Sequence, residues 1–170
     1  NVVTGEVEFN DNWAEMLGYK KEELNNDLAT WEDLIHPEDK ERIEKALKHH
    51  LQGDSEYYKT EHRLKTKDGH WKWIEDIGKV FKRDKEGNPI RAVGIHRDID
   101  ERKKSRKKLE YLSLHDKLTG VSNRRCFEQE LARLEDAKLV PTSIIVGDLD
   151  DLKSINDNYG HKMGDRFIKR

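Results

Sequence analysis

The fold of the first part of the chain is decided by residues 58–81, which read YKTEHRLKTKDGHWKWIEDIGKVF. In the first half, alternate positions hold the less charged side chains: Tyr58, Thr60, His62 and Leu64. This period of two is typical of a β-strand. A Lys-Asp-Gly turn follows, and the second half places its large apolar side chains on one face: Trp71, Trp73, Ile77 and Phe81. The stretch therefore predicts a β-hairpin.

Short helices are predicted before the hairpin. Asn10 or Asp11 can cap the first, Thr30 is expected to start the second, and Pro37 lies in the first turn of a third that ends at Gly53. After the hairpin, residues 90–99 predict a further strand, and residues 2–9 are expected to add edge strands. We expect an α+β domain whose sheet packs its apolar face on the helices.

The pattern changes to helical at Glu101. The basic run at 102–108 is followed by Leu109, Leu112 and Leu114, which predicts a linker helix. A solvated face is the usual role of such a run, and a nucleic-acid or lipid contact is the less common one. The leucines can begin a coiled-coil seam, but one heptad does not establish it. Residues 123–139 predict another helix, and residues 143–146 a buried strand that ends in an acidic loop.

Composition narrows the class of protein. The 170 residues provide room for one domain and part of another. The 33 basic and 35 acidic side chains give a net charge of −2, which favours no nucleic-acid partner. The single cysteine, Cys126, cannot form an intramolecular disulfide, and no zinc-binding spacing is present. With no signal peptide and no apolar run near the roughly 20 residues that span a bilayer, we expect a cytoplasmic protein with no membrane segment in this chain.

Residues 1–100 resemble a PAS sensor domain with its PAC segment. The resemblance is carried by four motifs in the expected order, Met16-Leu17-Gly18-Tyr19, Ile35-His36-Pro37-Glu38-Asp39, Lys67-Asp68-Gly69 and Asp98-Ile99-Asp100-Glu101-Arg102-Lys103. It implies a five-stranded antiparallel sheet with flanking short helices. It also implies a ligand cavity between sheet and helices, whose ligand is unknown and which can be empty. His36, His62 and His96 are chemically able to bind haem, although structural roles are commoner. The aromatic residues Tyr58, Trp71 and Trp73 are more simply core side chains.

Residues 116–170 resemble the beginning of a GGDEF domain, the α/β domain of diguanylate cyclases, and residues 101–115 would be the signalling linker helix. The motifs are Leu114-His115-Asp116-Lys117-Leu118-Thr119-Gly120, Asn123-Arg124-Arg125, the acidic run from Asp148 to Asp157, and Gly160-His161-Lys162-Met163-Gly164-Asp165. The family joins two GTP molecules into cyclic di-GMP with Mg²⁺, as a homodimer. The resemblance implies Asp148 as a metal ligand, and Lys153, Asn156 and Asp165 as substrate-binding residues. The Gly-Gly-(Asp/Glu)-Glu-Phe hairpin is missing, so no complete catalytic set is expected and this chain is predicted to be inactive.

Two alternatives remain open. From the residues alone, Asp148 and Asp150 would more commonly cap the helix that follows, whereas the resemblance favours metal binding for Asp148 and capping or support for Asp150. At the level of function, the chain is either the regulatory part of a diguanylate cyclase or a PAS ligand-binding or dimerisation module attached to a degenerate, non-catalytic GGDEF domain.

Overall fold

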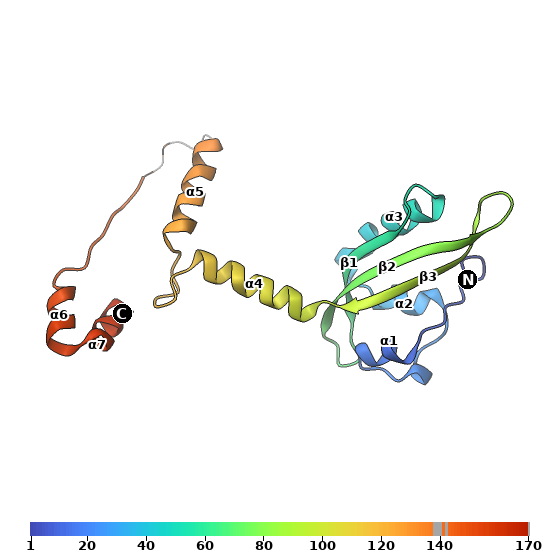
Figure 1. Cartoon of the computed structure of the whole chain (residues 1–170), viewed down its shortest axis with the longest axis horizontal. Helices are drawn as coiled ribbons and strands as arrows, with labels where there is room; N and C mark the ends of the chain where they lie inside the picture. The colour runs from blue at the N-terminus through green and yellow to red at the C-terminus, as the bar shows by residue number, and fades with distance from the viewer. Residues whose placement is uncertain (138–140, 142, 170) are drawn as a thin grey trace. The chain divides into compact units, whose positions relative to one another are not determined.

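The protein is described by a computed structural model, which covers residues 1–137, 141 and 143–169 (Figure 1). The chain forms two compact units, residues 1–104 and 105–170. The first unit contains α1 (Asp11–Met16), the 3-10 helix η1 (Lys21–Glu23), α2 (Leu28–Leu34), α3 (Pro37–Gln52), β1 (Tyr58–Lys65), β2 (Trp71–Arg83) and β3 (Pro89–Asp98). Helix α4 (Asp100–Leu114) begins in the first unit and ends in the second. The second unit also contains α5 (Arg124–Asp136), α6 (Leu152–Tyr159) and α7 (His161–Ile168).

The short helices of the first unit begin at polar caps. The side chain of Asn10 accepts a hydrogen bond from the backbone N–H of Trp13 at 2.8 Å, as predicted for the start of α1. Helix α2 begins earlier than predicted, because Asp27 is its cap and accepts hydrogen bonds from both the N–H and the hydroxyl of Thr30. Helix α3 has Pro37 in its first turn and ends at Gly53, whose φ of +93° is a left-handed conformation that glycine adopts without strain.

The predicted hairpin and third strand form an antiparallel sheet in the order β1-β2-β3. Tyr58 pairs with Gly78 and Arg63 with Trp73, and Ile77 pairs with Ile95 on the other side of β2. The described residues contain only these three strands, so the expected five-stranded sheet is wrong. Residues 2–9 form no strand: they make the isolated bridge between Glu6 and Asp27 and one backbone hydrogen bond from Val2 to Ile90, and the turn at Gly5 lies between these contacts.

The helices do not cover the face of the sheet that carries Trp71, Trp73 and Ile77, which was the expected one. The pairing of Tyr58 with Gly78 puts the alternate β1 residues that begin at Tyr58 on the same face as Ile74 and Asp76, and the helices cover this face. Its core also includes apolar side chains from the helical segments: Phe9, Trp13, Leu17, Trp31, Ile35 and Ile43. The opposite face carries Trp71, Trp73 and Ile77, with Val93 and Ile95 about 60% exposed beside them. Trp71 and Trp73 are therefore not core residues, whereas Tyr58 is.

The second unit is mostly helical in the described residues. The side chain of Asn123 caps α5 by accepting from the N–H of Cys126, and the helix ends at Asp136; its predicted extension to Leu139 falls outside the described residues. The strand predicted at 143–146 is absent, and Ile145 is 95% exposed. A strand requires a neighbour for its backbone N–H and C=O groups, and the described residues provide none there. None of the described helices has both the length and the apolar character needed to cross a bilayer.

Candidate functional site

A hydrogen-bonded chain of three side chains crosses the interior of the first unit. The indole N–H of Trp13 on α1 donates to Nδ1 of His96 on β3 at 2.6 Å. Nε2 of His96 lies 3.1 Å from Oδ2 of Asp76 on β2, and both side chains are almost completely buried. Because Nδ1 accepts the indole proton, the proton of a neutral imidazole is on Nε2, where it donates to the Asp76 carboxylate. These hydrogen bonds join helix α1 to strands β2 and β3.

A second polar group lies along β1 on the same face. The Thr60 hydroxyl donates to the Tyr58 hydroxyl at 3.0 Å and lies 3.0 Å from Nδ1 of His62. Burial raises the pKa of Tyr58, and the nearby Asp76 carboxylate raises it further. Burial lowers the pKa of His62 to about 4. The Tyr58 hydroxyl and the His62 imidazole are therefore both neutral near pH 7.

Two buried nitrogen atoms in this interior have no hydrogen-bond partner in the described part of the chain. They are Nε1 of Trp31 on α2 and Nε2 of His62. The two rings meet edge to face with their centroids 6.0 Å apart, and His62 lies 6.1 Å from His96 in the same manner. Buried polar groups are nearly always satisfied, so unpartnered atoms of this kind are where a bound group would be expected.

Of the three histidines singled out by sequence, His62 and His96 lie in the interior and His36 does not. The Nδ1 of His36 accepts from the N–H of Glu38 at the start of α3, and its ring packs against Trp71. The partners of the two interior histidines were not predicted from the sequence. Part of the cluster could have been found from the sequence. Thr60 and His62 lie on the same face of β1 as Leu64, and this covered face would normally carry apolar side chains.

The first turn of α4 is attached to the outer face of the sheet. Glu61 on β1 lies 2.7 Å from Nη2 of Arg102 and 2.5 Å from Nζ of Lys103. The hydrogen bond from Lys103 lowers the pKa of Glu61, so its carboxylate is charged near neutral pH. Lys103 Nζ also lies 4.5 Å from the centre of a ring of Trp73, a cation–π contact. We call Glu61, Trp73, Arg102 and Lys103 the α4 latch.

The backbone of Trp73 also makes hydrogen bonds to the residues at the start of α4. Its carbonyl accepts from the N–H of Ile99 at 3.0 Å, and its N–H donates to the carboxylate of Asp100. The α4 latch is therefore one residue away from the buried cluster along β1. Thr60 and His62 point into the interior, whereas Glu61 between them points to α4.

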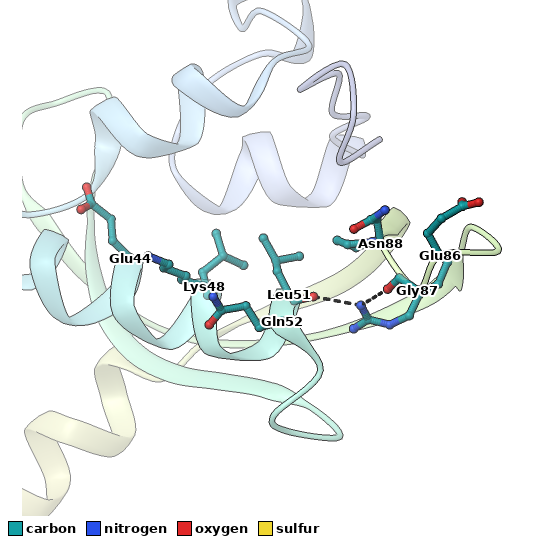
Figure 2. A pocket seen from close by; sticks show the side chains of 10 residues that line it. Glu44, Lys48, Leu51, Gln52, Glu86, Gly87 and Asn88 are labelled. Carbon is teal, nitrogen blue, oxygen red and sulfur yellow. Dashed lines mark hydrogen bonds between the residues drawn. The ribbon is translucent and has the colours of Figure 1, made fainter.

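An open depression of about 570 Å³ lies between the end of α3 and the β2–β3 turn (Figure 2). Nη1 of Arg83 donates to the carbonyl oxygen atoms of Leu51 at 2.9 Å and Gly87 at 3.0 Å. These bonds satisfy carbonyl groups at the C-terminus of α3 and in the turn. Arg83 therefore has a structural role here, and the depression is a weaker candidate than the interior cluster.

The second unit brings together only some of the residues predicted for GTP. Lys153 in the first turn of α6 lines an open depression of about 660 Å³ together with Leu149, Asp151, Leu152, Ser154, Asp157 and Asn158. Asn156 packs against α7, the helix that carries Asp165: a Cβ added to Gly164 would overlap with the side-chain amide of Asn156. Both Asn156 and Asp165 thus belong to one helical pair.

The acidic positions differ from their predicted geometry. Asp148 lies in an exposed segment without strand structure, and the cap residue of α6 is Asp151, not Asp150. Within residues 1–137, 141 and 143–169, no three acidic, histidine or cysteine side chains are grouped as a metal site would require. The carboxylate of Asp148 is a suitable Mg²⁺ ligand, but the described residues do not complete a magnesium site around it.

Comparison with known proteins identifies both parts of the chain. Residues 6–96, more than half of the chain, match the family model described as PAS fold. Residues 113–170 match the model described as Diguanylate cyclase, GGDEF domain. The chain is 33% identical over 181 aligned residues to an uncharacterized protein of Sinorhizobium fredii, covering 98% of this chain and 21% of that protein. It is 38% identical over 82 residues to the diguanylate cyclase VdcA of Vibrio cholerae, covering 48% of this chain and 23% of that protein.

Solved structures agree. The N-terminal domain of a diguanylate cyclase with PAS/PAC sensor from Marinobacter aquaeolei is 26% identical with a TM-score of 0.53, covering 61% of this chain and 93% of that one. A sensory box histidine kinase/response regulator from Burkholderia thailandensis is 29% identical with a TM-score of 0.52, covering 74% and 80%. The chain spans about a fifth of the length of the Sinorhizobium relative. The sheet with its helical cover, the matched family model and these neighbours lead to one conclusion: the chain belongs to the PAS fold family, and its PAS domain is followed by the beginning of a GGDEF domain.

Proposed function

We propose that this chain is the sensory and regulatory part of a diguanylate cyclase, a signal-transduction protein whose PAS domain controls the cyclase through α4. The order of the two family matches supports this role, as does the relative named as a diguanylate cyclase. The observation that carries the proposal is the attachment of α4 at both ends. Its first turn binds the sheet through the α4 latch, and its last turn accepts hydrogen bonds from Asn123 at Ser113 and Leu114.

The physical route from sensor to helix is short. A change in the hydrogen bonds of Thr60 or His62 inside the domain alters the position of β1, and Glu61 on the same strand holds Arg102 and Lys103. A small shift of a strand is transmitted along a helix because a helix is stiff, and packed interfaces switch between discrete arrangements. The α4 latch is the contact that such a shift would change first.

In the proposed cyclase, the 3′-hydroxyl oxygen of each of two GTP molecules attacks the α-phosphorus of the other. The hydroxyl proton is lost to solvent, the bond from the α-phosphorus to the β,γ-diphosphate breaks, and two pyrophosphates leave. Asp148 would bind Mg²⁺, Lys153 would contact a phosphate, and Asn156 and Asp165 would hydrogen-bond the guanine base. Two GGDEF domains must meet, so we propose a homodimer, with GTP as the substrate and the cytoplasm as the location. We propose that the 170-residue chain is inactive alone, because its sequence does not contain the Gly-Gly-(Asp/Glu)-Glu-Phe hairpin.

The test uses the protein that contains this chain together with the rest of its cyclase domain. Cyclic di-GMP formation is measured with GTP and Mg²⁺ for the unmodified protein, for Asp148→Ala and for Asp136→Ala, a matched control at the exposed end of α5. We expect product from the unmodified protein and the control, and at least a hundredfold loss in Asp148→Ala, as is typical when a catalytic electrostatic group is removed. Full turnover in Asp148→Ala would overturn the assignment. Nucleotide binding without turnover in the unmodified protein would support the degenerate alternative.

A further inference from the structure

The two unpartnered atoms in the PAS interior have opposite hydrogen-bonding character. The indole nitrogen of Trp31 always carries a hydrogen, so it is a donor. The character of His62 Nε2 follows from its neighbours. With the Thr60 hydroxyl donating to Tyr58, Thr60 meets Nδ1 of His62 as an acceptor, and we therefore assign the proton of His62 to Nδ1. A neutral imidazole with its proton on Nδ1 has a lone pair on Nε2, which is an acceptor.

The two atoms are complementary in character, and the rings that carry them are neighbours in the interior. Trp31 is 7% exposed and His62 is completely buried, and their rings are 6.0 Å apart edge to face. A hydroxyl oxygen about 2.9 Å from each nitrogen would accept from the indole N–H and donate to the imidazole. No cation or anion is required, because Asp76 is already paired with His96 and both ligating groups are neutral. Leaving both groups unsatisfied would cost roughly 1 to 3 kcal/mol each.

We propose that Trp31 Nε1 and His62 Nε2 form a binding site for one neutral hydroxyl group inside the PAS domain. The group belongs either to an internal water molecule or to a small alcohol or polyol, which share this chemistry. A carboxylate is excluded because it can only accept at neutral pH and would leave His62 Nε2 without a donor. An ammonium group is excluded because it can only donate, and Trp31 requires an acceptor. The inference deepens the proposed sensor role and rests on it, but it does not depend on cyclase activity.

The same core contains a matched control. Trp13 and His96 are also buried, but the Trp13 indole already donates to His96 Nδ1. The site therefore predicts opposite tautomers for two histidines in one interior, with the proton on Nδ1 in His62 and on Nε2 in His96. It also predicts that a bound hydroxyl group contacts the indole hydrogen of Trp31 and not that of Trp13.

The experiment is nuclear magnetic resonance of the ¹⁵N-labelled 170-residue chain at pH 7. Imidazole ¹⁵N shifts give the tautomers, and cross-relaxation detects a hydroxyl or water hydrogen near each indole hydrogen. Mass spectrometry of the solution released on denaturation separates the two sources: a released alcohol identifies an organic ligand, and a water contact without a released compound identifies internal water. Either result supports the site. A proton on His62 Nε2, or a Trp31 indole hydrogen with no more hydroxyl contact than that of Trp13 and no released compound, would overturn it. Cyclase turnover is not measured, so the site and the proposed enzyme can fail separately.

Discussion

The burial of His62 predicts that acid destabilises the PAS domain through this one residue. The pKa of His62 is about 4 in the folded protein against 6.5 for an unperturbed histidine. Desolvation is the main cause, and the nearby His96 and Arg42 also lower the pKa, whereas Asp76 and Asp39 raise it. Between pH 4 and pH 6.5 the unfolded chain therefore binds a proton at this position that the folded chain does not. Unfolding is then favoured as the pH falls, and the stability contribution of neutral His62 is complete only above pH 6.5.

The size of this effect follows from the pKa difference. At about 1.4 kcal/mol per pKa unit, the shift amounts to about 3 kcal/mol of unfolding free energy lost between pH 7 and pH 4. Urea unfolding followed by tryptophan fluorescence across this range measures it. His62→Gln replaces the imidazole with an uncharged amide, so we expect the variant to lose stability less steeply as the pH falls, whatever its stability at pH 7. His70→Gln changes an exposed histidine and should keep the slope of the unmodified protein. Parallel pH dependences for His62→Gln and the unmodified protein would show that His62 does not cause the loss of stability in acid.

Three further predictions follow from individual contacts. Asp39 is buried at the start of α3 and accepts three hydrogen bonds from Arg63, so Asp39→Ala should lower the unfolding free energy by about 3 kcal/mol in urea, with Glu38→Ala, an exposed neighbour, losing less than half as much. Gly164→Ala places a Cβ against the Asn156 amide, so in the complete cyclase the KM for GTP should rise about fivefold, the equivalent of one hydrogen bond; an unchanged KM would show that Asn156 is not positioned by this contact. Glu61→Gln weakens an exposed ion pair, so the first turn of α4 should exchange amide hydrogen faster by a factor of up to about five, and the difference should shrink in 1 M salt. Equal exchange rates in low salt would show that Glu61 does not stabilise the first turn of α4.

Local sequence signals predicted the elements of the first unit well, because turns and helix ends depend on neighbouring residues. The Lys-Asp-Gly turn, the Asn10 cap and the Gly53 end all lie where the sequence placed them. The prediction of which face of the sheet the helices cover was wrong for a physical reason. A period of two separates two faces but does not say which one the helices cover, and the apolar side chains of Trp13, Leu17 and Ile43 determine that only after folding.

The candidate site was only partly predictable. His62 and His96 were chosen for their chemistry, but the Trp13 partner of His96 lies 83 residues away, and no local pattern indicates a contact over that separation. Asp76 was missed because β2 contains many other charged residues, so that one more acidic side chain does not stand out in its sequence. In the second unit, the β-branched run at 143–146 predicted a strand from its side chains alone, whereas a strand also requires a paired neighbour.

We propose above that the PAS domain controls the cyclase through the attachment of α4 to the sheet. The decisive measurement is the initial rate of cyclic di-GMP formation in the protein that contains this chain and its whole cyclase domain, with Glu61→Lys compared with Glu86→Lys. Glu61→Lys repels Arg102 and Lys103, whereas Glu86→Lys makes the same charge change in the β2–β3 turn, away from α4. We expect the rate to change at least threefold in Glu61→Lys and to stay within experimental error in Glu86→Lys. An unchanged rate in Glu61→Lys would contradict it.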